Sequence, residues 1–530
     1  MKNLQITKLM MLAASASCSL AVELAQSNNQ IIGRAEHQAY ENSMYAPFTM
    51  PRDENASWSA HLVGSGFYFG ALEQKEGQGL GAAALWSGSN TMNVTLGTNQ
   101  AADPNDGTWL SGDQLGLGYS SNNVVGSMTL DPISYQTGAN FLVALEAISS
   151  NDMEFFAHVN IPVGVAVTDL QLTSNVERGD TAYGDILSPS SDDWGPHSLV
   201  EAFKGGNTIG SQYIGLKYGK IDGRQSTGVQ LGDVKMSVGI NLVHNENICW
   251  GLAVRGVAPL GNVATGEYIQ QPIFGNGGYW HAGLQTMGHF ILSDENDTQI
   301  RLKFDAWAVH VFANKKSKRS FDTITNGNGS KYLMVADYLN ADPDYIIKTG
   351  GIQNLINFST LKVNSSFAAE FDALLAFSLQ SDGFTFDLGY EFWGRTKEKL
   401  SLIEKLDNQR FGFLGQQRTT SGNDTTTGSN NYGEKNAVMG KLQPNNGDNL
   451  NDLTTDLTQA ANRIADTDLN VAGQTAPAVY TSTAFANASY QWDTKHFTPH
   501  VGMHASWEFS HSKNLAIPTV GVAINAGLAF

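Results

Sequence analysis

The feature that most constrains this chain is an alternation of apolar and polar side chains that continues from residue 361 to residue 379. Apart from one serine, the odd positions are apolar, whereas the even positions carry the charged residues Lys362, Glu370 and Asp372. Successive side chains of a β-strand point to opposite faces, so the pattern predicts a strand with one apolar and one charged face. Such a strand is longer than the roughly 5 or 6 residues usual in soluble sheets, and it exceeds the roughly 9 to 11 that a tilted strand needs to cross a bilayer.

A hairpin is predicted directly after this strand. Asp382 and Gly383 form a two-residue turn signal that is typical of type I′ hairpins. The residues at 384–392 alternate again, with apolar and aromatic side chains at the even positions. With this turn, Glu370 falls opposite Arg395, and the apolar faces of the two strands come to the same side of the sheet.

The same alternation recurs along the chain and continues to its last residue. It is found at 234–242, 250–258, 280–308 and 497–509. The final run has its apolar side chains at Val520, Val522, Ile524, Ala526, Leu528 and Phe530. These runs predict successive hairpins, each with one face suited to an apolar environment.

The final run resembles the last strand of bacterial outer-membrane β-barrel proteins, in which an alternating strand that ends in phenylalanine is the assembly signal. The resemblance implies that Phe530 and Leu528 are read by the barrel assembly machinery, although Leu528 stands where an aromatic residue is frequent. It also implies that the protein lies in the outer-membrane lipid of a Gram-negative type bacterium. The resemblance covers the strands rather than the loops and points to no substrate.

Composition supports the same architecture. Charged residues make up only 15% of the 530 residues, against roughly 25% in an average soluble protein. The mean hydropathy is nevertheless −0.22, and after the N-terminus no apolar run approaches the roughly 18 residues of a membrane-spanning helix. A barrel that turns apolar side chains to lipid and polar ones to its lumen explains both values. We therefore expect an all-β, transmembrane up-and-down antiparallel β-barrel of about 14 strands, within a range of 12 to 16.

The N-terminus indicates export. Residues 1–21 contain two lysines, an apolar stretch too short to span a bilayer and small residues before a cleavage site after Ala21, as in a secretory signal peptide. Cys18 would suit a lipid anchor, but Ser15 stands where that motif has leucine. Cleavage after Ala21 leaves Cys249 as the one cysteine of the mature chain, so no disulfide within the chain is expected.

We expect residues 58–530 to form the barrel, and the lengths of its loops predict its orientation in the membrane. Bacterial barrels have short periplasmic turns and long outer loops. The turns expected at the periplasmic side are short and lie near 244–247, 293–297, 382–383 and 491–496. The connections expected at the outer side are mostly long and lie near 261–276, 313–360, 396–478 and 511–516.

The N-terminal third is harder to assign. Its candidate strands, some of which could be paired ribbons of an outer loop, lie at 58–72, 80–86, 92–96, 115–119, 124–130, 141–148 and 155–172. The segment 171–210, with a helix expected near 198–203, falls on the periplasmic side in this arrangement. That segment is long for a periplasmic turn.

Two inserts bear on function. Residues 22–57 precede the first expected strand and suit either a periplasmic tail or a plug of the lumen. The long outer loop 396–478 contains Leu450, Leu453, Leu457, Ala461 and Ile464 at helical spacing. This stripe suits either a helix on the loop's own surface or a lid over the barrel.

The charged and histidine residues on the polar side of the predicted strands should line the lumen. Placing Arg or Lys on the lipid face near the midplane would cost about 2–4 kcal/mol each. The functional interpretation is an electrostatic pore lining, and the structural one is a wall stiffened by paired charges. The residues are Lys235, Arg255, Arg301, Lys303, Asp305, Lys362, Glu370, Asp372, Asp387, Glu391, Arg395, His500, His504 and Glu508.

The sequence argues against enzyme activity, against a metal site at the paired histidines and against nucleic-acid binding. His500 and His504 lie roughly 13 Å apart along one strand, which is too far for both to hold one metal ion. The sequence has no Gly-x-Ser-x-Gly, His-Glu-x-x-His or phosphate-binding loop motif, so we expect no enzyme activity and no cofactor. A net charge of −18 argues against a nucleic-acid partner, since phosphate contacts require Lys and Arg.

Three functional hypotheses remain. The first is a porin-like channel for passive passage of small polar solutes. The second is a gated transporter of apolar substrates, similar in outline to fatty-acid transporters with an N-terminal plug, and it requires residues 22–57 inside the lumen. The third is a structural or adhesive surface barrel with a closed lumen. The sequence leaves open whether the protein acts as a monomer or a homo-oligomer.

Overall fold

The computed structural model describes residues 34, 37–45, 58–71, 91–96, 109–117, 124–148, 154–177, 195–209, 213–245, 247–295, 297–327, 329–339, 346–406, 410–413, 463–492, 494, 497–510 and 518–530. The expected signal peptide and its cleavage site lie outside these residues. So does the helical stripe from Leu450 to Ala461. Its last member, Ile464, lies in the short strand β23 (Arg463–Ile464) rather than in a helix.

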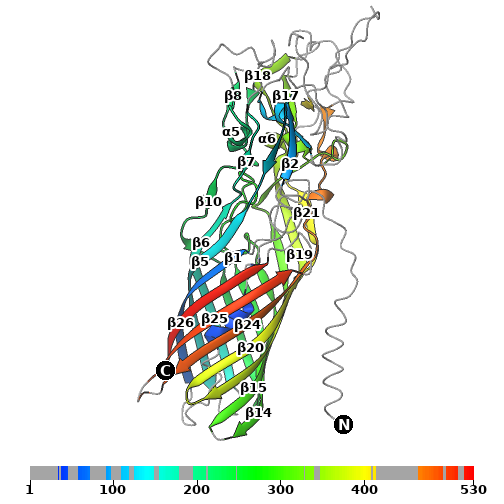
Figure 1. Ribbon diagram of the computed structural model, residues 1–530. Coiled ribbons are helices and arrows are strands. Elements are labelled where there is room, and N and C mark those ends of the chain that lie inside the picture. Colours follow the sequence, from blue (N-terminus) through cyan, green and yellow to red (C-terminus); the bar gives the residue numbers. More distant parts are fainter. Residues whose placement is uncertain are drawn as a thin grey trace, which may run out of the picture.

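Twelve of the described strands close into one antiparallel barrel (Figure 1). The barrel closes because the first of these strands pairs with the last and also with the second. The expected antiparallel barrel is confirmed, with twelve strands rather than about 14. The twelve are β1 (Trp58–Ala71), β5 (Ile133–Ile148), β6 (Glu154–Asp169), β12 (Val234–His244), β13 (Ile248–Ala258), β14 (His281–Glu295), β15 (Thr298–Asn314), β19 (Thr360–Ser381), β20 (Phe384–Arg395), β24 (Val479–Gln491), β25 (Thr498–Ser510) and β26 (Thr519–Ala529).

The β19–β20 hairpin has the register that the sequence predicts. Glu370 lies opposite Arg395 in the ladder. Asp382 and Gly383 have φ angles of 47° and 78°, and both values lie in the left-handed region that a type I′ turn requires. The turn residues therefore fix which side chains of the two strands face the same way.

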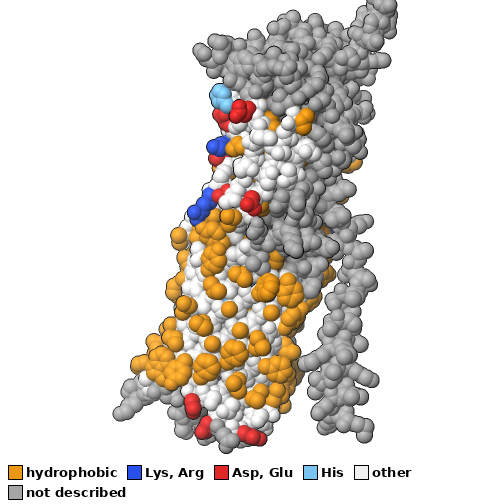
Figure 2. Space-filling view, viewed as in Figure 1, with side chains coloured by type: hydrophobic (Ala, Val, Ile, Leu, Met, Phe, Trp, Pro, Cys, Tyr) orange, Lys and Arg blue, Asp and Glu red, His pale blue; other side chains and the backbone are white. Residues whose placement is uncertain are grey.

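The barrel is apolar outside and polar inside. On β19, for example, Phe377 is 55% exposed and the next residue, Ser378, is 2% exposed. Figure 2 shows exposed apolar side chains as a broad band across the visible face of the barrel, with acidic residues near its lower rim. This distribution is that of a barrel whose outer face meets lipid. Among the described residues, no helix has the length and apolar character needed to cross a membrane.

The two ends of the barrel differ in their connections. Four hairpins join β12–β13, β14–β15, β19–β20 and β24–β25 by short turns at one end, which we call the short-turn end, as expected. The long connections gather at the opposite, long-loop end (Figure 1). The segment 171–210 was expected at the periplasmic side, but its described parts lie at the long-loop end. The reason is that β6 runs to that end and pairs directly with β12, so no further barrel strand intervenes.

The described parts of the long connections fold together into a second unit, which we call the cap. It contains one sheet of six strands and one of four, and it packs two short helices, α5 (Leu199–Lys204) and α6 (Ile356–Ser359), into a common apolar core. The helix expected near 198–203 is confirmed as α5, with Ser198 accepting a hydrogen bond from the Glu201 backbone N–H at 3.2 Å. The six-stranded sheet comprises β23, β22 (Phe411–Phe413), β17 (Met334–Leu339), β18 (Ile346–Asn354), β9 (Tyr213–Ile214) and β8 (Thr208–Ile209).

The four-stranded sheet explains the difference in strand number. It is formed by β3 (Trp109–Ser111), β2 (Thr91–Leu96), β4 (Val124–Thr129) and β7 (Thr173–Ser174). Two of the candidate strands, 92–96 and 124–130, therefore pair with each other in the cap, as the alternative of outer-loop ribbons allowed. The expected strand at 115–119 is wrong in its described part, because Leu115 ends the 3-10 helix η2 (Gly112–Leu115).

Four further short strands extend barrel strands toward the cap. β10 (Arg224–Ser226) and β11 (Gln230–Leu231) pair with β6. β16 (Lys318–Ser320) and β21 (Glu398–Leu402) pair with the outer part of β19. Because of these pairings, β6 and β19 connect barrel and cap.

Candidate functional site: a plug in the barrel lumen

A short helix lies inside the barrel. This helix, α2 (Gln38–Tyr45), appears in dark blue within the barrel in Figure 1. Its residues and the preceding Arg34 and His37 contact inward-facing side chains on both sides of the wall, from β19 and β20 to β1. We call Arg34 together with His37–Tyr45 the plug. Residues 22–57 were expected to be either a tail or a plug, and their described part lies in the lumen.

Arg34 is the plug residue that lies close to the largest number of charged side chains among the described contacts. Its guanidinium pairs with Asp372 of β19 and Glu391 of β20, and it lies 3.6 Å from a carboxylate oxygen of Glu508 of β25. All four side chains are at most 2% exposed. Three buried carboxylates so close together would repel one another, so the arginine compensates charge that the wall alone leaves unbalanced. The guanidinium also lies 5.7 Å from the centre of the Trp393 ring.

A second set of polar contacts holds the helix itself. Glu41 pairs with Lys235 of β12 and lies 3.8 Å from the guanidinium of Arg255 of β13. The side-chain carbonyl of Gln38 accepts a hydrogen bond from the Trp307 indole N–H at 3.0 Å. Lys235 and Arg255 come from β12 and β13, on another side of the barrel from the strands that hold Arg34, whereas Trp307 comes from β15, which is the neighbour of β19.

Ring contacts complete the fit of the plug against β1. The ring of His37 stacks on that of Phe69, with centroids 3.9 Å apart and planes 5° apart. Tyr40 packs beside Phe67 and Phe69 at centroid distances of 5.6 and 5.5 Å. Tyr40 also lies 5.8 Å from His504 of β25. The plug is thus held by ion pairs on two sides and by aromatic packing on a third.

The structure places every predicted lumen residue on the inward face except Lys362. The charged residues that contact the plug are Lys235, Arg255, Asp305, Asp372, Glu391 and Glu508. Those that pair within the wall are Lys303 with Asp387 at 3.0 Å and Arg395 with Glu370 at 4.0 Å. Arg301, His500 and His504 are also buried in the barrel. His504 Nδ1 lies 2.7 Å from the side-chain oxygen of Asn487.

Lys362 does not line the lumen. It is exposed and pairs with Glu404 at 3.2 Å. At this position β19 has passed the end of β15 and β20 and pairs with β16 and β21 of the cap. The alternation of the strand continues beyond the barrel, so parity alone could not reveal that its polar face no longer points into the lumen.

Sequence reasoning did not identify Arg34, Gln38 or Glu41. One signal for Arg34 was present. In the ladder Glu391 and Glu508 both lie opposite Thr483, so the two carboxylates are near neighbours without a cation between them. Such an uncompensated pair on an inward face calls for a cation from elsewhere in the chain. Among the described residues, no group of three or more His, Cys, Asp or Glu side chains is placed to hold a metal ion.

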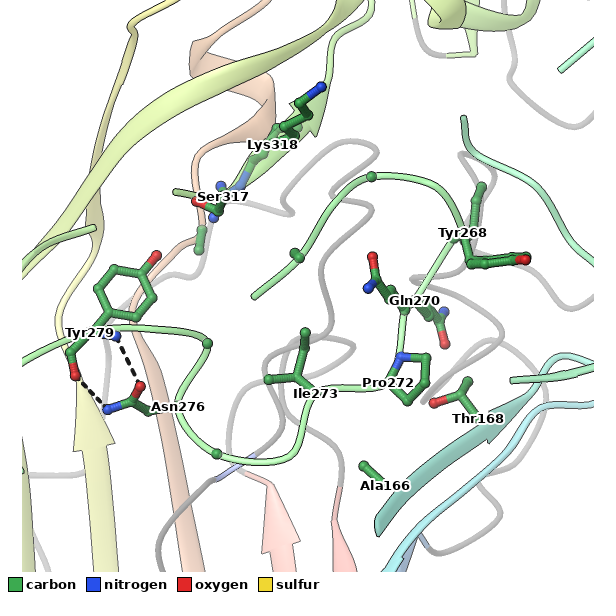
Figure 3. Close-up of a pocket in the computed structure, with 18 of the residues that line it drawn as sticks. Ala166, Thr168, Tyr268, Gln270, Pro272, Ile273, Asn276, Tyr279, Ser317 and Lys318 are labelled. Carbon is green, nitrogen blue, oxygen red and sulfur yellow. Dashed lines mark hydrogen bonds between the residues drawn. The ribbon is translucent and has the colours of Figure 1, made fainter. Parts of the chain in front are cut away.

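A cavity of about 200 Å³ lies on the long-loop side of the plug. Figure 3 shows the segment from Tyr268 to Ile273 along one side of it, with Ser317 and Lys318 across from them. Asn276 and Tyr279 close another side, joined by two hydrogen bonds of 2.6 and 2.9 Å. The barrel wall contributes Phe367, Glu370, Trp393 and Arg395. Trp393 therefore faces both this cavity and the plug residue Arg34.

A smaller cavity of about 40 Å³ lies beside the plug. It is bordered by His37, Tyr40 and Glu41 of the plug and by Pro162 and Phe274. The plug thus borders the smaller cavity directly, whereas Trp393 lies between Arg34 and the larger one.

Comparison with known proteins gives likeness in structure only. No protein-family model matches the chain, and no curated protein matches its sequence. One similar solved structure is an outer-membrane channel from Pseudomonas putida F1, with 9% identity, a TM-score of 0.35 and coverage of 89% of this chain and 96% of that one. A FadL homologue of Pseudomonas aeruginosa is 9% identical, covers 96% of each chain and has a TM-score of 0.28. A deletion mutant of the TodX monoaromatic hydrocarbon channel is 7% identical, with coverage of 89% and 90% and a TM-score of 0.30. The solved structures that this chain resembles are bacterial outer-membrane β-barrel proteins.

Proposed function

We propose that this protein is an outer-membrane channel gated by its own N-terminal plug, and that it admits small molecules with apolar bodies. The observation that carries the proposal is the position of Arg34 and α2 within the lumen, bound to opposite sides of the wall. A solute that crosses the barrel must pass or displace this segment. Of the three hypotheses from the sequence, this is the second, which required part of residues 22–57 inside the barrel.

The plug disfavours the open porin that the sequence first suggested. In a porin the inward charges would face a continuous column of water. Here Asp372, Glu391 and Glu508 are at most 1% exposed at their side chains and bind an arginine of the same chain. The ion pairs and hydrogen bonds that hold the plug are non-covalent, so these polar groups can form hydrogen bonds with water when the plug moves.

The lining of the cavity favours substrates with an apolar body. Tyr279, Phe367 and Trp393 present three aromatic rings to the space immediately outside the plug. Ligand sites are typically lined by apolar and aromatic side chains with a few polar groups that set orientation. A molecule held in this cavity is in direct contact with Trp393, against which Arg34 lies on the lumen side.

The test is single-channel recording of the refolded protein in planar bilayers, comparing the wild type with Arg34→Gln. Removing one partner of a buried ion pair costs about 3–5 kcal/mol, which corresponds to at least roughly a 100-fold shift in a two-state equilibrium. We expect a mostly closed wild type and frequent large openings in the variant. Lys303→Gln is the matched control, because it removes one partner of a buried ion pair that lies within the wall, with Asp387 at 3.0 Å.

The apolar part of the proposal has its own measurement. Proteoliposomes that contain the wild type should take up the neutral fluorophore N-phenyl-1-naphthylamine faster than vesicles without protein, while glucose entry stays at the background rate. Large constant openings in the wild type that Arg34→Gln leaves unchanged would show an open porin. Equal entry of both probes would reject the apolar preference.

A further inference from the structure

The cavity outside the plug has a fixed aromatic wall. Tyr279 and Phe367 meet edge to face, with centroids 5.5 Å apart and planes at 66°. The Tyr279 hydroxyl is held by Ser365 Oγ at 2.6 Å, which fixes the position of its ring. The indole of Trp393 is fixed in the same way, because its N–H donates to Glu370 at 3.1 Å. Tyr279, Phe367 and Trp393 are 8%, 3% and 1% exposed, so a flat apolar group would contact rigid, preformed ring surfaces over small areas.

Arg395 also lines this wall, and the ion pair of its guanidinium is long. Its guanidinium lies 4.3 Å from the centre of the Phe367 ring and 5.8 Å from that of Trp393. Its side chain is 11% exposed, and its ion pair with Glu370 is long, at 4.0 Å. The Nε–H has no hydrogen-bond partner among the described residues. Leaving a buried guanidinium donor unsatisfied is costly, so the group is suited to bind an incoming acceptor.

Arg319, which lines the same cavity, provides the contrast. It forms two ion-pair contacts with Glu398 at 2.6 and 2.7 Å and donates to the backbone carbonyl of Gln474 at 2.8 Å. Its charge is therefore already compensated. The Nε–H of Arg319 also lacks a hydrogen-bond partner among the described residues, so the two arginines differ in their ion pairs: Arg319 has close contacts with Glu398, whereas Arg395 is 4.0 Å from Glu370.

Two further observations indicate an anionic ligand. The hydroxyl of Ser317 lines the cavity, is buried and has no hydrogen-bond partner among the described residues. The charged side chains of the lining are Lys318, Arg319, Arg395 and Glu370. Since Glu398 compensates Arg319, the balance of the remaining charges is positive. The cavity thus combines aromatic rings, a free hydroxyl donor and a planar cation.

We propose that this cavity binds aromatic carboxylates, with the ring of the ligand against Phe367 and Trp393 and its carboxylate on Arg395 and Ser317. The planar guanidinium matches a carboxylate in shape and charge. The proposal rests on the proposed function and deepens it by naming the class of substrate that binds on the long-loop side of the plug. Binding here places the ligand against the same indole that contacts Arg34.

The experiment is isothermal titration calorimetry of full-length protein in lipid nanodiscs with 2-naphthoate. The neutral 2-naphthamide tests the charge, and decanoate tests the aromatic ring. We expect 2-naphthoate to bind at least about tenfold more tightly than either compound, as the loss of a charge-assisted hydrogen bond would predict. Arg395→Gln should weaken 2-naphthoate by a similar factor and leave 2-naphthamide within about twofold.

Controls separate the site from general effects of charge and folding. Arg224→Gln removes an arginine that lies 5.5 Å from the Tyr135 ring and outside this cavity, so it should bind 2-naphthoate like the wild type. If Arg395→Gln does not fold, Ser317→Ala replaces it, with an expected loss of about threefold to tenfold for 2-naphthoate alone.

Each alternative result overturns a stated part of the proposal. Equal affinity for 2-naphthamide would remove the carboxylate requirement, and equal affinity for decanoate would remove the aromatic one. Unchanged binding in both Arg395→Gln and Ser317→Ala would place the ligand elsewhere. Absent binding together with plug-dependent conductance would reject this site and keep the gated channel. Binding together with constant open conductance would keep the site and reject the gate.

Discussion

The barrel and the cap are both built from β-strands, yet the balance of apolar and charged side chains that they bury differs. In the cap, buried residues such as Phe203, Phe321 and Val335 form an apolar core of the kind found in soluble proteins. In the barrel, most apolar side chains lie outside, and the interior holds charges such as Lys303 and Asp387 beside the aromatic rings that contact the plug. The period of two is the same in both units, and the surroundings of the strand decide which face is buried.

This difference agrees with our proposal that the plug, which is the part that moves, lies in the barrel rather than in the cap. The plug binds two sides of the wall through charged and hydrogen-bonding groups, which water can replace if the plug moves, and it packs through Tyr40 and Met44 on a third side. The cap is held by apolar contacts, and separating its strands would expose them to water. Polar contacts in the lumen therefore suit a reversible closure, whereas the cap is suited to remain assembled around the cavity.

The largest expected effect concerns the buried charges of the cap. Lys331 and Asp322 form an ion pair of 3.2 Å with both side chains 0% exposed. Burial lowers the pKa of Lys331, and the nearby Asp322 carboxylate partly offsets this shift. Asp322→Asn leaves the lysine without its counter-charge and should lower the free energy of unfolding of the cap by about 3–5 kcal/mol.

Urea denaturation of the protein in lipid vesicles, followed by limited proteolysis, measures this effect. The double variant Asp322→Asn with Lys331→Met should recover much of the lost stability, since replacing a whole buried pair with an apolar group is often neutral. Barrel integrity, read from gel mobility without heating, should stay unchanged. A loss of barrel and cap together would contradict the division into two units.

The second largest effect is expected when a charge is placed on the outer surface of the barrel, which we assign to lipid. Val238 lies midway along β12 and is 64% exposed, on the face that we assign to lipid. Val238→Arg should destabilise the folded barrel by about 2–4 kcal/mol, because the charge would lie near the membrane midplane. Folding titrations in lipid vesicles provide the measurement.

Val229 is the matched control for this substitution. It is 81% exposed and lies between β10 and β11 at the long-loop end. Val229→Arg should change stability by less than about 0.5 kcal/mol, as is usual for an exposed surface site. Similar costs at both positions would show that the face of Val238 does not meet lipid.

The sequence could predict the barrel strands because their information is local. The alternation on β19 and the Asp382-Gly383 turn are enough to set the β19–β20 register, and Glu370 does lie opposite Arg395. The inward position of the lumen charges follows from the same parity. These predictions needed only the geometry of a strand and the cost of placing charge in lipid.

The plug and the cap depend on partners distant in sequence. β2 carries an alternation like that of a barrel strand, and only its pairing with β3 and β4 assigns it to the cap. The plug is short and shows no periodicity that would separate it from a periplasmic tail. Arg34 is held in the lumen by Asp372 and Glu391, which follow it by more than 300 residues. Local patterns carry no information on such contacts.

The smallest expected effect tests where β19 leaves the lumen. Lys362 and Glu404 are 49% and 39% exposed at their side chains, so their 3.2 Å ion pair is accessible to solvent. The backbone N–H of Lys362 also donates to Glu404 at 3.0 Å, and this hydrogen bond lowers the pKa of the carboxyl group. Glu404→Gln should therefore cost at most about 1 kcal/mol at pH 7.

The pH dependence of this cost follows from the direction of the pKa shift. A carboxyl group whose pKa is lower in the folded state stabilises the fold above its unfolded pKa, and that contribution is lost as the pH falls through the folded pKa. The difference between wild type and Glu404→Gln should accordingly be present at pH 7 and disappear on acidification below the usual range for glutamate. Urea titrations of both proteins across this range measure it. A cost of several kcal/mol would mean that Lys362 lies in a buried charge network like that of the lumen, and would restore it to the predicted lining.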